Sequence, residues 1–272
     1  MQRISLTWVI ETFRAIDALE SVREGNSLWV STSTLYTAKN QIDVLFQQSV
    51  YSSHLRVSRE KALALADVIA GLVGQVSPQD RVLNSFEAFQ IANSRNEFIT
   101  VFKSELSTLP SFLVMEKQAF DLNTLIDFGE RLFPVSMATK VPEAIVDANQ
   151  AAKALAFELG TACGFHVFRV VEAVLKRYWD VVSGGSDRPK PQSLGRMASE
   201  LEAQKHGEKR TWEALKQMAE LHRNPLIHPE AILTIEEAIG IIGMARSVIT
   251  IMLNSIPDAL PTTVTAPTTA PA

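Results

Sequence analysis

Apolar residues recur at intervals of three and four along most of this 272-residue chain. The pattern is clear in "WVIETFRAIDALESV", which begins at Trp8, and in "SREKALALADVIAGLVG", which begins at Ser58. Such spacing places apolar side chains on one face of an α-helix, whereas a half-buried strand needs strict alternation. The sequence therefore predicts a mostly α fold.

Changes in composition divide the chain further. We predict four segments: an N-terminal helical domain (1–108), a connector with a short strand (109–146), a bundle of four to five helices (147–255) and a disordered Pro/Thr/Ala tail (256–272). Ser77 and Pro78 are typical helix-start residues within the first domain. In the connector the strand-like run is Phe112 to Met115, and its many Phe and Leu residues favour packing against a domain. The tail has too few core-forming residues to fold.

The longest helical pattern runs from residue 147 to 182 and contains no proline. The stretch "SGGSDRPKP" breaks it, and two shorter helical patterns follow. A final helix is predicted from Thr234, because Thr234 and Glu237 have the spacing of a capping box. This order of helices predicts the C-terminal bundle.

The charge of the chain limits where a polyanion can bind. The net charge is −4, so the whole molecule has no general attraction to nucleic acid or to an anionic membrane. Residues 1–146 hold 13 Lys+Arg against 16 Asp+Glu, and residues 147–254 hold 13 of each. Any polyanion site in the C-terminal half must therefore be a local patch.

The residues that bind metals and cofactors are scarce or scattered. The single cysteine, Cys163, excludes an intrachain disulfide and a cysteine-cluster metal site. The five histidines do not have the spacing of a metal-ligand set, and no glycine-rich loop of the phosphate-cradling type is present. We predict neither a metal nor a cofactor.

The sequence also gives an expectation about location. The first residues lack the uninterrupted apolar core of a signal peptide. The apolar run from Ile239 to Leu253 is too short to span a bilayer and carries Arg246. We predict a cytoplasmic protein with no membrane partner.

Chemically capable residues gather in "LHRNPLIHPE", residues 221–230. Pro225 has no backbone N–H and disfavours helical geometry at the residue before it, so the preceding helix is predicted to end or kink near Asn224. In an unbroken helix, side chains five residues apart point in different directions, because each residue turns the helix by about 100°. A break allows Arg223 and His228 to face one cavity.

Arg223, Asn224 and His228 together resemble the signature of the HEPN superfamily. In that signature an arginine, commonly followed by a polar residue, precedes a histidine by four to six positions. The helix order is also similar, with a long helix before the motif and a final helix after it, and so is "GFHVFRVVEAVLKRYW" upstream. The resemblance covers residues 147–255 and implies a HEPN-like helical bundle.

The resemblance implies a metal-independent endoribonuclease that acts in anti-phage defence or in a toxin-like stress response. His228 would be the acid or base and Arg223 the phosphate anchor, with Asn224 in support. The products would be a 2′,3′-cyclic phosphate and a 5′-hydroxyl. The family usually forms one composite site from two protomers, so the implied partners are RNA, a second copy and a regulatory or antitoxin protein.

A polar stripe marks the long helical pattern. His166, Arg169, Glu172 and Lys176 follow one another at intervals of three and four residues among apolar neighbours. One interpretation is a solvated face with an ion pair between Arg169 and Glu172. The other is that Glu172 or Arg169 faces the Arg223/His228 cavity and orients it. The sequence leaves both open.

Other readings also stay open. Arg188 and Lys190 lie in a predicted loop that contacts an RNA backbone or is simply solvated. Arg223, Asn224 and His228 can serve only as a helix cap. The alternative function is a non-catalytic HEPN-like module that binds a nucleotide, an RNA or a partner protein within a larger defence complex. A purely structural bundle is the third possibility.

Overall fold

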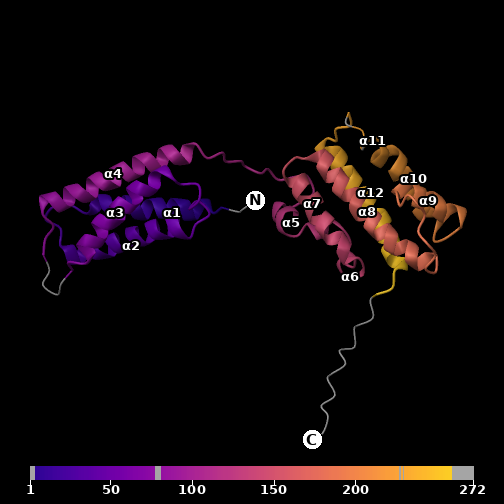
Figure 1. Ribbon diagram of the computed structural model, residues 1–272, viewed down its shortest axis with the longest axis horizontal. Helices are drawn as coiled ribbons and strands as arrows, with labels where there is room; N and C mark the ends of the chain where they lie inside the picture. The colour runs from indigo at the N-terminus through magenta and orange to yellow at the C-terminus, as the bar shows by residue number, and fades with distance from the viewer. Residues whose placement is uncertain (1–3, 77–80, 227, 229, 259–272) are drawn as a thin grey trace, which may run out of the picture. The chain divides into compact units, whose positions relative to one another are not determined.

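The computed structural model describes residues 4–76, 81–226, 228 and 230–258. These residues form an all-helical structure with essentially no strands, which confirms the predicted mostly α fold. The chain divides into two compact units, Met1–Phe112 and Leu113–Ala272, called unit 1 and unit 2 below (Figure 1). The predicted tail lies almost wholly outside the described residues.

The described residues of unit 1 form four helices that lie side by side (Figure 1). They are α1 (Leu6–Asp17), α2 (Leu28–Gln47), α3 (Val57–Val73) and α4 (Ser85–Ser107), with the 3-10 turn η1 (Ala18–Ser21) after α1. Their apolar faces meet in a core that includes fully buried Leu35, Leu65 and Phe98. Ser77 and Pro78 lie outside the described residues, and α4 begins instead behind Asn84, which forms a capping box with Glu87.

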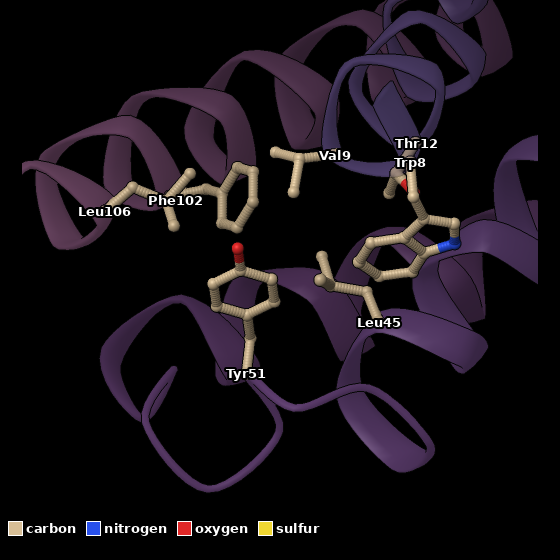
Figure 2. Close-up of a pocket in the computed structure, with 7 residues that line it drawn as sticks. All are labelled: Trp8, Val9, Thr12, Leu45, Tyr51, Phe102 and Leu106. Atoms are coloured by element: carbon tan, nitrogen blue, oxygen red, sulfur yellow. The ribbon is translucent and has the colours of Figure 1, made fainter. Parts of the chain in front are cut away.

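A small apolar cavity lies inside unit 1 (Figure 2). Its volume is about 10 Å³, room for a single water molecule. The Tyr51 hydroxyl points toward the ring of Phe102, and Trp8 stacks on Tyr51 with 6.4 Å between ring centroids (Figure 2). The cavity is a packing gap and is too small for a substrate.

Glu105 on α4 ties this unit together by capping the start of α3. Its carboxylate accepts hydrogen bonds from the amides of Arg56, Val57 and Ser58 at 2.7–2.8 Å, and from the Ser58 hydroxyl. These amides have no partner within α3, so a carboxylate there also matches the positive end of the helix dipole. Burial raises the pKa of the Glu105 carboxyl, but these hydrogen bonds outweigh burial and hold the pKa below its usual value.

We expect Glu105→Gln to destabilise unit 1 by about 1–2 kcal/mol at neutral pH, because the amide loses the charge that favours these hydrogen bonds. The pKa of the Glu105 carboxyl is lower in the folded chain than in the unfolded chain. Its contribution to stability is therefore complete above the unfolded-state pKa and is lost as the pH falls through the folded-state pKa. The difference between wild type and variant should therefore shrink below about pH 4. Hydrogen exchange of the α3 amides, at neutral pH and below about pH 4, measures this difference in stability between wild type and variant. The exposed Glu11→Gln is the control, and a Glu105 effect that stays constant with pH would contradict the account.

Unit 2 contains the helices of the predicted bundle and those of the preceding segment. Its elements are α5 (Leu122–Asp127), η2 (Gly129–Leu132), α6 (Met137–Lys140), η3 (Pro142–Ala144), α7 (Ile145–Ala156), α8 (Gly160–Val182), α9 (Leu194–Ala203), α10 (Lys209–Met218), η4 (Ala219–Arg223), α11 (Asn224–Leu226) and α12 (Ile235–Ser255). Helix α8 packs along both α7 and α12 (Figure 1). Buried Val167, Val171 and Ile241 belong to the shared core.

The predicted strand from Phe112 to Met115 is wrong. This segment is irregular chain, and the nearest ladder contact is one isolated bridge between Lys117 and Phe120. A lone extended run has no neighbouring strand to satisfy its backbone groups. The chain is fixed here by the buried Lys117 ammonium, which donates to the Met115 carbonyl and to the Glu158 carboxylate at 2.8 and 2.9 Å.

The long helical pattern from residue 147 to 182 is two helices, not one. A turn at Phe157–Leu159 separates α7 from α8, and Glu158 within it has a φ of 62°. The two helices therefore form a hairpin in which α7 packs against α8. This hairpin brings the start of α7 beside the middle of α8.

Helix α12 is longer than the apolar run read from the sequence. At 21 residues it is long and apolar enough to cross a membrane by length and composition. Its apolar side chains, among them Ile241, Val248 and Met252, are buried in the core of unit 2. In its most apolar stretch of 18 residues, 44% of the helix is buried inside the unit.

Candidate functional site

The helix that carries the Arg–His motif (residues 223–228) changes its winding before the proline. After α10, residues Ala219–Arg223 form a π-helical turn, η4, and the Asn224 N–H donates to the Ala219 carbonyl five residues earlier. Pro225 has no N–H to donate, and its ring crowds the carbonyl four residues before it. A wider turn relieves that crowding. The helix then continues as α11 to Leu226, so the predicted disruption occurs one turn before the proline.

This turn directs Arg223 toward α8. The Arg223 Nε donates to Glu172 Oε1 at 3.2 Å, and the two side chains are 26% and 21% exposed. The pair joins residues far apart in the sequence and is partly shielded from water. Glu172 is therefore bonded to Arg223, and Arg169 is bonded to Asp147.

His228 and Asn224 are both exposed, and their side chains form no hydrogen bond or ion pair within the described part of the chain. The backbone of His228 is held by turn bonds: its N–H donates to the Pro225 carbonyl at 3.0 Å, and its carbonyl accepts from Ala231. The structure therefore brings Arg223 to Glu172 but does not bond the His228 imidazole to either of them.

Two glycines on α8 allow the chain that flanks the motif to lie directly on that helix. A Cβ atom at Gly160 would come within 2.3 Å of the Leu233 carbonyl oxygen, and one at Gly164 within 2.5 Å of the Leu233 side chain and 3.0 Å of Leu226. The Leu233 N–H also donates to the Thr161 hydroxyl at 3.1 Å. The start of α8 thus contacts Leu226, inside the Arg–His motif, and Leu233, five residues after it.

A second charged cluster lies on α8 beside α7. Asp147 Oδ1 is 2.8 Å from His166 Nδ1 and 2.8 Å from Arg169 Nε. The exposed fractions of the side chains are 15% for Asp147, 33% for His166 and 66% for Arg169. Asp147 does not stand out in the sequence, because α7 and α8 share one continuous helical pattern there.

The polar stripe read from the sequence is real and lies on one side of α8. We call His166, Arg169, Glu172 and Lys176 the α8 polar face. Each is partly or well exposed, and each of the first three contacts a charged group on a neighbouring element. The face therefore collects Asp147 from α7 at one end and Arg223 from η4 at the other.

The remaining predicted residues lie apart from these pairs. Arg188 binds the Asp180 carboxylate, with Nε and Oδ1 2.9 Å apart, and this hydrogen bond raises the pKa of Arg188. Lys190 is exposed. His222 is half-buried near Glu237, whose pKa is lowered mainly by hydrogen bonds from Thr234 and further by His222.

Thiol and metal chemistry find no support in the described residues. Burial raises the pKa of the Cys163 thiol to about 12, so it is protonated and unreactive at neutral pH. Within residues 4–76, 81–226, 228 and 230–258, no group of three or more His, Cys, Asp or Glu side chains is arranged to hold a metal ion. The chemistry available at this surface is that of imidazole, guanidinium and carboxylate.

Comparisons with protein-family models, curated proteins and solved structures give no match for this chain. The likeness to HEPN proteins therefore rests on the Arg–His motif and on the order of the helices.

We expect Gly160→Ala to destabilise unit 2 by about 1–3 kcal/mol, because its Cβ would overlap a backbone carbonyl that cannot simply rotate away. Gly240→Ala is the matched control: no atom lies within 4 Å of its Cβ position in α12. Helix propensity alone should then make that variant up to about 1 kcal/mol more stable. Urea unfolding measures both changes, and equal effects would refute the close contact between α8 and Leu233.

Proposed function

We propose that unit 2 binds RNA on the α8 polar face and cleaves it without a metal ion. The observation that carries the proposal is the Arg223–Glu172 pair, in which a π-helical turn next to a proline holds a guanidinium against the polar face of a core helix. Such turns are frequent at functional sites. The HEPN resemblance supports RNA as the ligand.

Arg223 remains able to bind a phosphate while it is paired. Only its Nε donates to Glu172 among the described residues, which leaves the two terminal nitrogens for a phosphate. A guanidinium binds two phosphate oxygens with parallel hydrogen bonds and stays charged at any physiological pH. Glu172 sets its direction, so less side-chain entropy is lost when RNA binds.

The proposed reaction is an internal transfer at phosphorus. A base removes the proton from a ribose 2′-hydroxyl, the 2′-oxygen bonds to phosphorus, and the bond to the 5′-oxygen breaks as that oxygen takes up a proton. The products are a 2′,3′-cyclic phosphate and a 5′-hydroxyl, and no water or metal is consumed. His228 is the candidate acid or base of the motif, and Arg223 is the phosphate anchor with Asn224 in support.

A second copy of the chain is part of this proposal. Large apolar side chains are exposed around the α8 contact with the motif: Leu159, Phe165, Leu221 and Ile232. Clusters of exposed apolar side chains are common at protein interfaces. A homodimer through this region would supply His228 of one protomer to the polar face of the other, as the family resemblance implies. We further propose a cytoplasmic role in defence or stress with a regulatory partner.

The exposed His228 imidazole favours the other candidate function. A histidine that no neighbour orients is a poor acid or base, since proton transfer needs fixed geometry. Under this reading the α8 polar face of unit 2 binds a nucleotide, an RNA or a partner protein without cleaving it, as a subunit of a larger defence complex.

The test is cleavage of a mixed pool of single-stranded RNA in EDTA by the full chain. We expect cyclic-phosphate products from wild type and at least about a hundredfold slower cleavage by Arg223→Ala. Arg14→Ala changes an exposed arginine of unit 1, away from the α8 polar face, and should cleave at the wild-type rate. No cleavage by wild type, with RNA still bound, would establish the binding module instead. Equal cleavage by all three proteins would exclude Arg223 from the reaction.

A further inference from the structure

The α8 polar face contains a histidine, His166, which a neighbouring carboxylate orients, unlike the His228 imidazole. Asp147 Oδ1 lies 2.8 Å from His166 Nδ1 and 2.8 Å from Arg169 Nε, so the two nitrogens are at most twice that distance apart. A single carboxylate oxygen from α7 thus gathers an imidazole and a guanidinium. Arg223 and His228, the pair predicted from the sequence, are not joined in this way.

The carboxylate fixes the chemical state of the ring. An ionised Asp147 can only accept, so His166 Nδ1 carries the proton of this hydrogen bond. In the neutral ring Nε2 is then the basic nitrogen. The His166 side chain is 33% exposed, so a ligand can reach the ring, while Asp147 is 15% exposed and partly shielded from water.

Arg169 adds a phosphate contact at the same place. Its Nε is bound to Asp147, and with 66% of its side chain exposed the terminal nitrogens are accessible. The cluster therefore presents, in one copy of the chain, a basic nitrogen beside a guanidinium. These are the two groups that cleavage through a 2′-hydroxyl requires.

We propose that His166 is a catalytic residue: its Nε2 takes the proton of the ribose 2′-hydroxyl while Arg169 binds the reacting phosphodiester. This inference rests on the proposed RNA cleavage and assigns its base. The 2′-oxygen bonds to phosphorus, the bond to the 5′-oxygen breaks, and that oxygen takes a proton from a water molecule. The hydroxide that remains takes the proton held on His166, which returns the ring to its neutral state. Asp147 is a positioning residue that acts through His166.

Two parts of the α8 polar face then bind different phosphates of the same RNA strand. His166 and Glu172 are six residues apart, about 9 Å along the axis of α8. One strand of nucleic acid at about 3.4 Å per nucleotide crosses that length in two to three nucleotides. Arg223, held at Glu172, thus anchors a flanking phosphate while the reacting phosphate lies at Arg169. The substrate is a single strand of at least three or four nucleotides.

The kinetic test compares His166→Ala with His54→Ala, an exposed histidine of unit 1, in the same RNA cleavage assay. We expect His166→Ala to lower kcat at least about a hundredfold, with KM for RNA nearly unchanged, and His54→Ala to match wild type. Added imidazole should restore part of the activity of a His166→Gly variant. Thermal unfolding of each variant separates loss of the base from loss of fold.

A measurement independent of turnover tests the position of Asp147. Side-chain nitrogen NMR of the full chain should show His166 with its proton on Nδ1, and Asp147→Asn should change that tautomer distribution. A short 2′-O-methyl RNA, which cannot react, should shift the His166 Nε2 resonance in wild type. RNA cleavage that survives His166→Ala overturns this inference and leaves the proposed function standing. Absence of cleavage in wild type overturns both, and an Nε2 resonance that RNA does not move overturns the placement of substrate at His166.

Discussion

Pro225 is the constraint on which the candidate site depends. A proline inside a helix removes one hydrogen bond and crowds the carbonyl of the preceding turn. The chain meets this by widening that turn into η4, where Asn224 bonds to Ala219 across five residues. The widened turn ends at Arg223 and holds its guanidinium against Glu172. A regular helix would distribute these side chains differently, because each residue turns it by about 100°.

Helix α8 is the helix against which the Arg223 side chain and the chain around the motif pack. One side of it is buried between α7 and α12, and its glycines let the chain around Leu226 and Leu233 lie against it. The other side carries the α8 polar face. Because α7 and η4 both contact α8, Asp147 and Arg223 both bond to polar residues of that helix. The contribution of these partly exposed ion pairs to the stability of the fold is small.

Much of this arrangement could be predicted from the sequence, and the reasons for the failures are physical. Apolar periodicity gave the helices, and the capping box at Thr234 and Glu237 located the start of α12 correctly. The apolar spacing continues across the three-residue turn at Phe157–Leu159, so it does not reveal that turn. The α7–α8 hairpin was therefore not predicted, and neither was the contact of Asp147 with α8. The strand at Phe112 failed because apolar composition does not reveal whether a partner strand exists. The proline was rightly taken as a disturbance, but its position in the chain does not say that the adjustment comes one turn earlier.

The central claim is that phosphates of RNA contact guanidinium groups on the α8 polar face. The dependence of RNA affinity on salt concentration tests it most directly, because each phosphate contact to a single strand contributes about 0.7 to the slope of log affinity against log salt. The account predicts that Arg223→Ala lowers the magnitude of this slope by about that amount, whereas Arg14→Ala, in unit 1, leaves it unchanged. Identical slopes for wild type and Arg223→Ala would contradict it.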